Sequence, residues 1–186
     1  MVNSTATDVD TALDELAVAV RSVSPETLDR IAAEIARANV VAAFAGGREG
    51  LVLRGLIMRL FHAGLDAHYQ GEMTTPHVGT GDLLILSCGP GNISMVEALA
   101  GVAKKAGARI LYFTAEPDNP PADLADTVVV INAQTMANDT GSAAVLPMGS
   151  GFEIAMFVFV DLITNRVREI RAESPELMRS RHTNLE

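Results

Sequence analysis

The sequence predicts an α/β protein in which helices cover both faces of a parallel sheet. Short apolar segments alternate with amphipathic ones along most of the chain. Nearly every position of the apolar segments is hydrophobic, which is typical of strands buried on both faces of a parallel sheet. Glycines follow several of these segments where a strand turns into a helix. Right-handed crossovers are expected to join the strands.

Two helices are expected before the first strand. Residues 8–21 repeat apolar side chains at helical spacing. Ser24 is expected to cap the second helix, because a proline follows it at the first helical position. Since no strand precedes these helices, residues 1–38 are predicted to form an arm or an interface element.

Residues 39–172 are predicted to form the α/β core, in which strands and helices alternate. Gly64 is expected to end the first core helix, and Lys104 and Lys105 are favourably placed near the end of another. The expected strands are 40–47, 66–70, 82–88, 109–114 and 127–132. The expected helices between them are 49–64, 92–107 and 121–126.

A long last helix is expected over residues 150–171. It is apolar on almost every side between Phe152 and Ile163, so it should be buried on most sides. We expect one domain over residues 1–186. Because a single domain of this size does not cover every side of that helix, part of its apolar surface is expected to contact a second subunit. Residues 173–186 are predicted to be a C-terminal tail.

Composition limits the classes of partner. The net charge of −9 disfavours nucleic acid and anionic membranes as partners. No apolar segment approaches the roughly 20 residues that a spanning helix needs, and the N-terminus lacks the features of a signal peptide. A single cysteine, Cys88, agrees with a reducing compartment, so a cytoplasmic location is expected. No metal-ligand spacing is present, and no metal or other cofactor is expected.

Three junctions are candidates for a ligand site, because ligands of parallel α/β sheets bind beyond the carboxyl ends of the strands. These junctions are residues 46–50, 87–92 and 114–119. Glycines at the first two allow close approach of a ligand and expose helix N-terminal amides. Tight turns without any ligand are an alternative interpretation of the same residues.

Four segments carry a resemblance over nearly the whole chain: "GREGLVLRGLIMRLFHAGL", "GEMTTP", "LPMGSGFEIAMFVFVD" and the terminal "RHTNLE". With the strand–"GPG"–helix turn, they resemble the 6-phospho-3-hexuloisomerase family of sugar isomerase (SIS) domains. The resemblance implies a flavodoxin-like three-layer α-β-α sandwich with a five-stranded parallel sheet. It also implies a homo-oligomer, a dimer or tetramer, with sites at subunit interfaces. The implied activity is isomerisation of the aldose–ketose/keto type, which interconverts 3-hexulose 6-phosphate and fructose 6-phosphate without a metal.

The two phosphate-binding turns depart from that family. The family has G-R-S-G and S-G-S-G-E-T, whose hydroxyl groups hold the phosphate. Glu49, Cys88, Pro90 and Ile93 stand at those places and offer no hydroxyl. Losing three hydrogen bonds to a charged group would cost about 4–9 kcal/mol of binding free energy. The substrate is therefore expected to be a phosphosugar held differently or an unphosphorylated sugar, and a non-catalytic sugar-binding or regulatory protein is the alternative.

Two residues are the candidate catalytic groups for an enediol mechanism, which needs a base at carbon and an acid at oxygen. Glu153 is the expected base, because it is a lone carboxylate beside an apolar segment and matches the family's active-site glutamate. A helix N-terminal acid favoured by the dipole is the alternative interpretation. His182 matches the family's terminal histidine and is the expected acid; an ordinary chain terminus is the alternative.

Further residues are candidates for binding the sugar. Glu72 is expected to bind hydroxyls, to orient Arg48 or to form a structural ion pair. His62 lies on the same helical stripe as Arg48 but about 21 Å away, so it would contribute only across an interface; a solvated or interfacial face is the alternative. The expected substrate-binding residues are Arg48, Glu49, Cys88, Gly89, Gly91, Asn92, Ser94, Glu72, Thr74, Thr75 and His62.

Overall fold

A five-stranded sheet forms the centre of the molecule, with every neighbouring pair of strands parallel. The structure is a computed structural model and describes residues 4–139 and 144–185, so the last residue of the "RHTNLE" segment and the first three of the N-terminal arm lie outside it. The strand order is β2-β1-β3-β4-β5. The strands are β1 (Val40–Ala45), β2 (Asp66–Tyr69), β3 (Leu83–Ser87), β4 (Arg109–Thr114) and β5 (Thr127–Val130).

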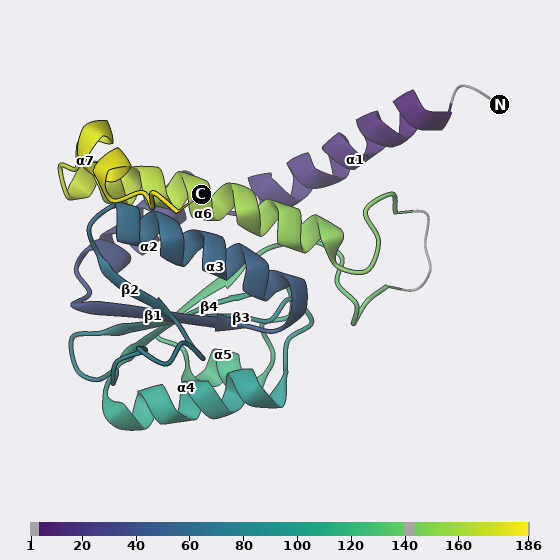
Figure 1. Cartoon of the computed structure of the whole chain (residues 1–186). Coiled ribbons are helices and arrows are strands. Elements are labelled where there is room, and N and C mark those ends of the chain that lie inside the picture. Colours follow the sequence, from purple (N-terminus) through teal and green to yellow (C-terminus); the bar gives the residue numbers. More distant parts are fainter. Residues whose placement is uncertain (1–3, 140–143, 186) are drawn as a thin grey trace.

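Helices cover both faces of this sheet, as the sequence predicts. The helices α2, α3 and α6 lie on one face and α4 and α5 on the other, while α1 extends away from the body (Figure 1). The predicted three-layer sandwich is therefore confirmed. The helices are α1 (Ser4–Arg21), α2 (Pro25–Ala36), α3 (Gly47–His62), α4 (Ser94–Ala106), α5 (Pro120–Leu124), α6 (Ser150–Ile170) and α7 (Pro175–Ser180).

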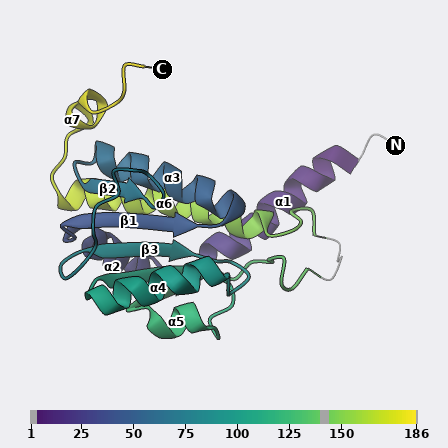
Figure 2. The same ribbon diagram turned by 60° about the horizontal axis from the view of Figure 1, so that its bottom comes forward.

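The strand order places a ligand site at one position of the sheet. The chain moves outward from β1 to β2 and then returns past β1 to β3, so the direction of winding reverses between β1 and β3. Beyond these two strands, α3 and α4 leave toward opposite faces (Figure 2). Such a reversal opens a crevice at the carboxyl ends of the two strands.

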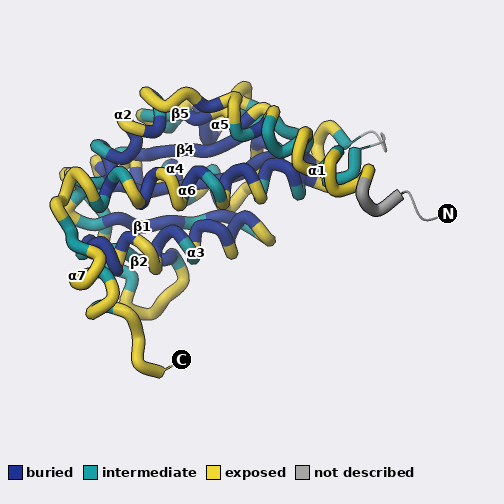
Figure 3. The backbone as a smooth tube through the Cα atoms, turned by 90° about the horizontal axis from the view of Figure 1, so that it is seen from above, coloured by how far each residue is buried: buried dark blue, intermediate teal, exposed yellow. Residues whose placement is uncertain are grey.

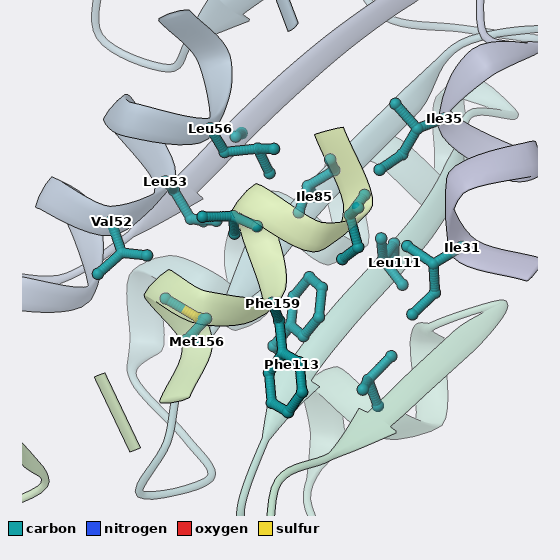
Figure 4. Close-up of a cluster of buried hydrophobic side chains, with 14 of the residues drawn as sticks. Ile31, Ile35, Val52, Leu53, Leu56, Ile85, Leu111, Phe113, Met156 and Phe159 are labelled. Carbon is teal, nitrogen blue, oxygen red and sulfur yellow. The ribbon is translucent and has the colours of Figure 1, made fainter. Parts of the chain in front are cut away.

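The main hydrophobic core lies between the sheet and α2, α3 and α6. Phe159 of α6 lies among Ile31 of α2, Leu53 of α3 and Phe113 of β4 in this core (Figure 4). The helix α6 therefore packs across the middle of the sheet, between α2 and α3. A second cluster, which includes Tyr112, fills the space between the sheet and α4.

The two N-terminal helices differ in their role. The helix α2 buries one face, including Leu28 and Ile35, against α6 and the sheet, so it belongs to the core rather than to a projecting arm. Its expected cap is present, since Ser24 accepts a hydrogen bond from the amide of Thr27. By contrast, residues 7–10 of α1 are exposed (Figure 3). Only α1 therefore resembles the expected arm.

Several helix limits differ from the expected ones, and one helix was not expected. The helix α4 begins at Ser94, not at Asn92, because Ile93 occupies the capping position and the Asn92 side chain donates to Glu97 instead. A short helix, α7, lies in the segment expected to be a tail, and Ser174 caps it. In the described part of the chain, no helix has both the length and the apolar character to cross a membrane.

Candidate active site

A cavity of about 380 Å³ lies at the carboxyl ends of β1 and β3, at the reversal of the sheet's winding. Three parts of the chain meet there: the start of α3, the turn after β3, and the start of α6 with the loop before it. The third predicted junction, residues 114–119, does not line the cavity. The lining residues are Gly46, Gly47, Arg48, Glu49, Gly89, Pro90, Ile93, Thr135, Met136, Pro147, Met148, Gly149, Ser150, Phe152 and Glu153.

Glu153 presents a carboxylate to this cavity from the first turn of α6. Its Oε2 atom lies 3.1 Å from Nε of Arg48, and Nη1 of Arg48 donates to the hydroxyl of Ser150 at 3.1 Å. The ion pair lacks hydrogen-bond geometry, so the buried Oε2 has no hydrogen-bond partner among the described residues. Burial raises the pKa of Glu153, and the positive charge of Arg48 partly offsets that rise. The carboxylate can therefore accept a proton from a ligand in the cavity.

Glu49 is the second carboxylate of the cavity, and its side chain turns toward the end of β3. The amide of Gly89 donates to its two oxygens at 2.9 and 3.1 Å, and the hydroxyl of Ser87 donates to it as well. Only 9% of Glu49 is exposed. Burial raises its pKa, the bonds from Ser87 and Gly89 oppose this, and the charge of Glu153 adds to the rise.

The turn after β3 approaches Glu49 closely because residue 89 is a glycine. A Cβ atom there would lie 3.0 Å from the ring of Phe152 and 3.2 Å from Oε1 of Glu49. Contacts that short require the neighbours to move, so the glycine permits the contact between the turn, α3 and α6. Gly89 was predicted to bind substrate, and it lines the cavity.

The other predicted residues of this turn lie outside the cavity lining. Cys88 is fully buried, and burial raises the pKa of its thiol to about 12. The carbonyl of Gly91 accepts a hydrogen bond from Tyr112 at 2.6 Å. Asn92 and Ser94 are exposed at the start of α4. Their binding roles stay predictions.

The predicted residues after β2 also lie away from the cavity. Glu72 and Thr74 are exposed, and the Glu72 carboxylate lies 3.9 Å from Nδ1 of His68. The hydroxyl of Thr75 donates to the carbonyl groups of Tyr69 and Glu72 at 3.1 and 2.9 Å. In one chain, Glu72 therefore does not orient Arg48, whose partners are Glu153 and Ser150.

His182 lies far from Glu153 within one chain. Its ring packs 5.2 Å from the ring of His62, which ends α3, whereas Glu153 lies beside Arg48 at the start of α3. The helix α7, which comes just before His182, lies at the C-terminal end of α6, whereas Glu153 is in the first turn of α6 (Figure 1). Glu153 and His182 can therefore share a site only if they come from different chains.

One wall of the cavity was not predicted as part of the site. It consists of Thr135 and Met136 after β5 and of Pro147 and Met148 before α6. The segment "LPMGSGF" was a signal for the second half, since it joins the predicted last helix and carries the resemblance. In the described ranges, no group of three or more histidine, cysteine, aspartate or glutamate side chains is placed to hold a metal ion.

Comparisons with known proteins show the family of this chain. No protein-family profile matches the chain. A 3-hexulose-6-phosphate isomerase from Mycobacterium gastri is 40% identical over 173 residues, which cover 93% of this chain and 87% of that protein. The chain belongs to the 3-hexulose-6-phosphate isomerase family. Another 3-hexulose-6-phosphate isomerase, from Bacillus subtilis, is 30% identical over 94% of this chain and 95% of that protein.

A solved structure supports the same family. It is a protein from Methanococcus jannaschii with an inferred 3-hexulose-6-phosphate isomerase function. It is 27% identical, has a TM-score of 0.83, and the match covers 97% of this chain and 99% of that one. The expected SIS phosphosugar isomerase fold and the expected enzyme class, a sugar isomerase, are therefore confirmed.

Proposed function

We propose that this member of the 3-hexulose-6-phosphate isomerase family moves a carbonyl group along a hexulose skeleton through an enediol, with Glu153 as the base. The observation that carries the proposal is the Glu153 carboxylate at the cavity, with a raised pKa and a buried oxygen that has no hydrogen-bond partner among the described residues. The names of the relatives support the hexulose skeleton.

The chemistry needs one base that works at two neighbouring carbons. Glu153 would remove the proton from the carbon beside the carbonyl, and the electron pair would form the enediol while the carbonyl oxygen takes up a proton. The proton on Glu153 would then return to the adjacent carbon as the other oxygen loses its proton. His182 is proposed as the acid that serves the oxygens. The positive charge of Arg48 favours the ionised form of Glu153, which is the form that acts as the base.

We propose that a second copy of the chain supplies His182. A groove of about 420 Å³ between α3 and α6 borders the cavity, and it shares Arg48 and Glu153 with it. Its apolar rim is exposed: 65% of Leu51 and 48% of Phe157 are accessible. Exposed apolar surface of this kind is typical of subunit contacts. A homo-oligomer would cover the groove and bring a neighbour's chain to Glu153.

A non-catalytic sugar-binding protein is the second candidate function. The contacts of Glu49 favour it, because its carboxylate accepts the hydrogen bonds of donors at the end of β3 that could otherwise bind an anionic ligand. Incubating the protein with fructose and with fructose 6-phosphate in deuterated water separates the two functions. An isomerase is expected to place solvent deuterium on the carbon next to the carbonyl. Binding of a sugar without any exchange would refute the enzymatic proposal.

The pH dependence of turnover is expected to follow Glu153. The base works when it is ionised, so activity should rise with pH through the raised pKa of Glu153. Replacing Arg48 with Met removes a positive charge that lowers this pKa, so the acid limb of the pH–rate profile should move to higher pH. The control is Arg59→Met, which removes another guanidinium of α3, one that lies 3.9 Å from Asp161 of α6. An acid limb that stays in place, or moves to lower pH, in the Arg48 variant would count against Glu153 as the base.

A further inference from the structure

The hydrogen-bond donors at the end of β3 are already occupied by a side chain of the protein itself. The Ser87 hydroxyl and the Gly89 amide both donate to the carboxylate of Glu49. Glu49 is 40 positions from Gly89 in the chain, yet the two meet directly at the cavity. An anionic group of a ligand would therefore have to displace an internal anion from the same donors.

The helix dipoles around the cavity are complemented internally in the same way. The cavity is lined by residues at the start of α3, α4 and α6, and helix N-termini attract negative charge. Each of these helices has its own acid in the first turn: Glu49 in α3, Glu97 in α4 and Glu153 in α6. The partial positive charges at the N-termini of these three helices are therefore compensated by acidic side chains of the protein itself.

The charged side chains that line the cavity have a negative sum. Among the described residues that line the cavity, Arg48 is the one cation, and Glu49 and Glu153 are the two anions. Arg48 is moreover paired with Glu153 and donates to Ser150. A phosphate ester carries nearly two negative charges near neutral pH and offers mainly acceptors. It would meet carboxylates that also only accept hydrogen bonds.

A hydroxyl group fits this end of the cavity better than a phosphate does. The side chain of Glu153 lines the cavity and 14% of it is exposed, and a sugar hydroxyl can donate a hydrogen bond to its carboxylate. Glu49 retains a small exposed fraction at the cavity, and a carboxylate can accept about four hydrogen bonds. Both carboxylates are thus suited to bind hydroxyl groups of a neutral sugar.

We propose that Glu49 is a specificity-determining residue, which excludes a phosphate group from the end of β3 and selects a sugar that presents uncharged hydroxyl groups there. The part about the sugar rests on the proposed function, whereas the exclusion of anions does not. The substrate class is then a free hexulose.

Calorimetric titrations with fructose, fructose 6-phosphate and sodium sulfate test this proposal on the full chain. Sulfate is included because it stays a dianion through the whole pH range in which carboxylates titrate. The wild-type protein is expected to bind fructose more tightly than fructose 6-phosphate. The variants Glu49→Ser and Glu49→Gln should bind both sulfate and fructose 6-phosphate at least about tenfold more tightly than the wild type, which corresponds to about 1.4 kcal/mol.

Glu169→Gln is the matched control, because it changes the net charge equally at an exposed site near the other end of α6. Tighter binding of fructose 6-phosphate than of fructose by the wild type would overturn the proposal. So would an unchanged sulfate affinity in the Glu49 variants, or an equal gain in the control. Glu49→Gln keeps the shape of the side chain and carries the test if Glu49→Ser unfolds. These titrations measure binding alone, so a protein without deuterium exchange would refute the proposed function and leave this one standing.

Discussion

Replacing Glu153 with glutamine is expected to reduce turnover about 100- to 10,000-fold, which is the usual contribution of a general base. Glutamine has nearly the same shape but cannot take up a proton, so the cavity should remain while the proton transfer fails. The ion pair with Arg48 is lost too, but 62% of that arginine side chain is exposed, so its contribution to stability is small. The measurement is the steady-state rate of hexulose conversion, together with deuterium exchange.

The Glu169→Gln variant is again the control, since it removes a carboxylate from the same helix away from the cavity. Its turnover should equal that of the wild type. A thermal unfolding curve shows whether the Glu153 variant is still folded. Full activity in a folded Glu153→Gln protein would remove Glu153 from the mechanism.

Mixing two inactive variants is expected to restore activity if the site is shared between chains. His182→Ala should lose turnover about 100- to 10,000-fold, as expected for an acid catalyst. After random reassembly with Glu153→Gln, about one quarter of the sites in a symmetric oligomer would combine an intact Glu153 with an intact His182. About a quarter of the wild-type rate is therefore expected from the mixture.

The reason for this expectation is the separation within one chain. His182 packs against His62 at the end of α3, whereas Glu153 lies beside its start. Subunits must exchange during mixing, which is checked by mass after tagging one variant. If the mixed oligomers form but remain inactive, His182 does not act at a neighbour's Glu153.

The sheet could be predicted from the sequence because strands that are buried on both faces of a parallel sheet are apolar at nearly every position. Every residue of β3 is buried, and the run "LLILS" is apolar up to its last position. The helix α7 was missed, although its signal was present. Ser174, Pro175 and Glu176 repeat the Ser-Pro-Glu start of α2, but α7 has only six residues and buries none. It therefore leaves no apolar periodicity to detect.

The site could be predicted only in part, because its contacts join residues far apart in sequence. Glu153 and Arg48 were both expected at the site, and they lie together in the cavity. The partners of Glu49 could not be expected, because the direction of its side chain depends on how the fold places the start of α3 beside the end of β3. The part of the loop wall formed by Thr135 and Met136 has no regular spacing, so no pattern in the sequence marks it, and Met148 was marked only by the segment that carries the resemblance.

The state of Cys88 has a practical consequence for work on this protein. The chain has one cysteine, its side chain is fully buried, and the pKa of its thiol is raised to about 12. Thiol reagents react with the ionised form, so the native protein should be nearly inert to maleimides at neutral pH. A cysteine introduced on α7 would then be the sole site of labelling, and a fluorophore or spin label attached there could follow the movement of the chain end without first removing the natural thiol.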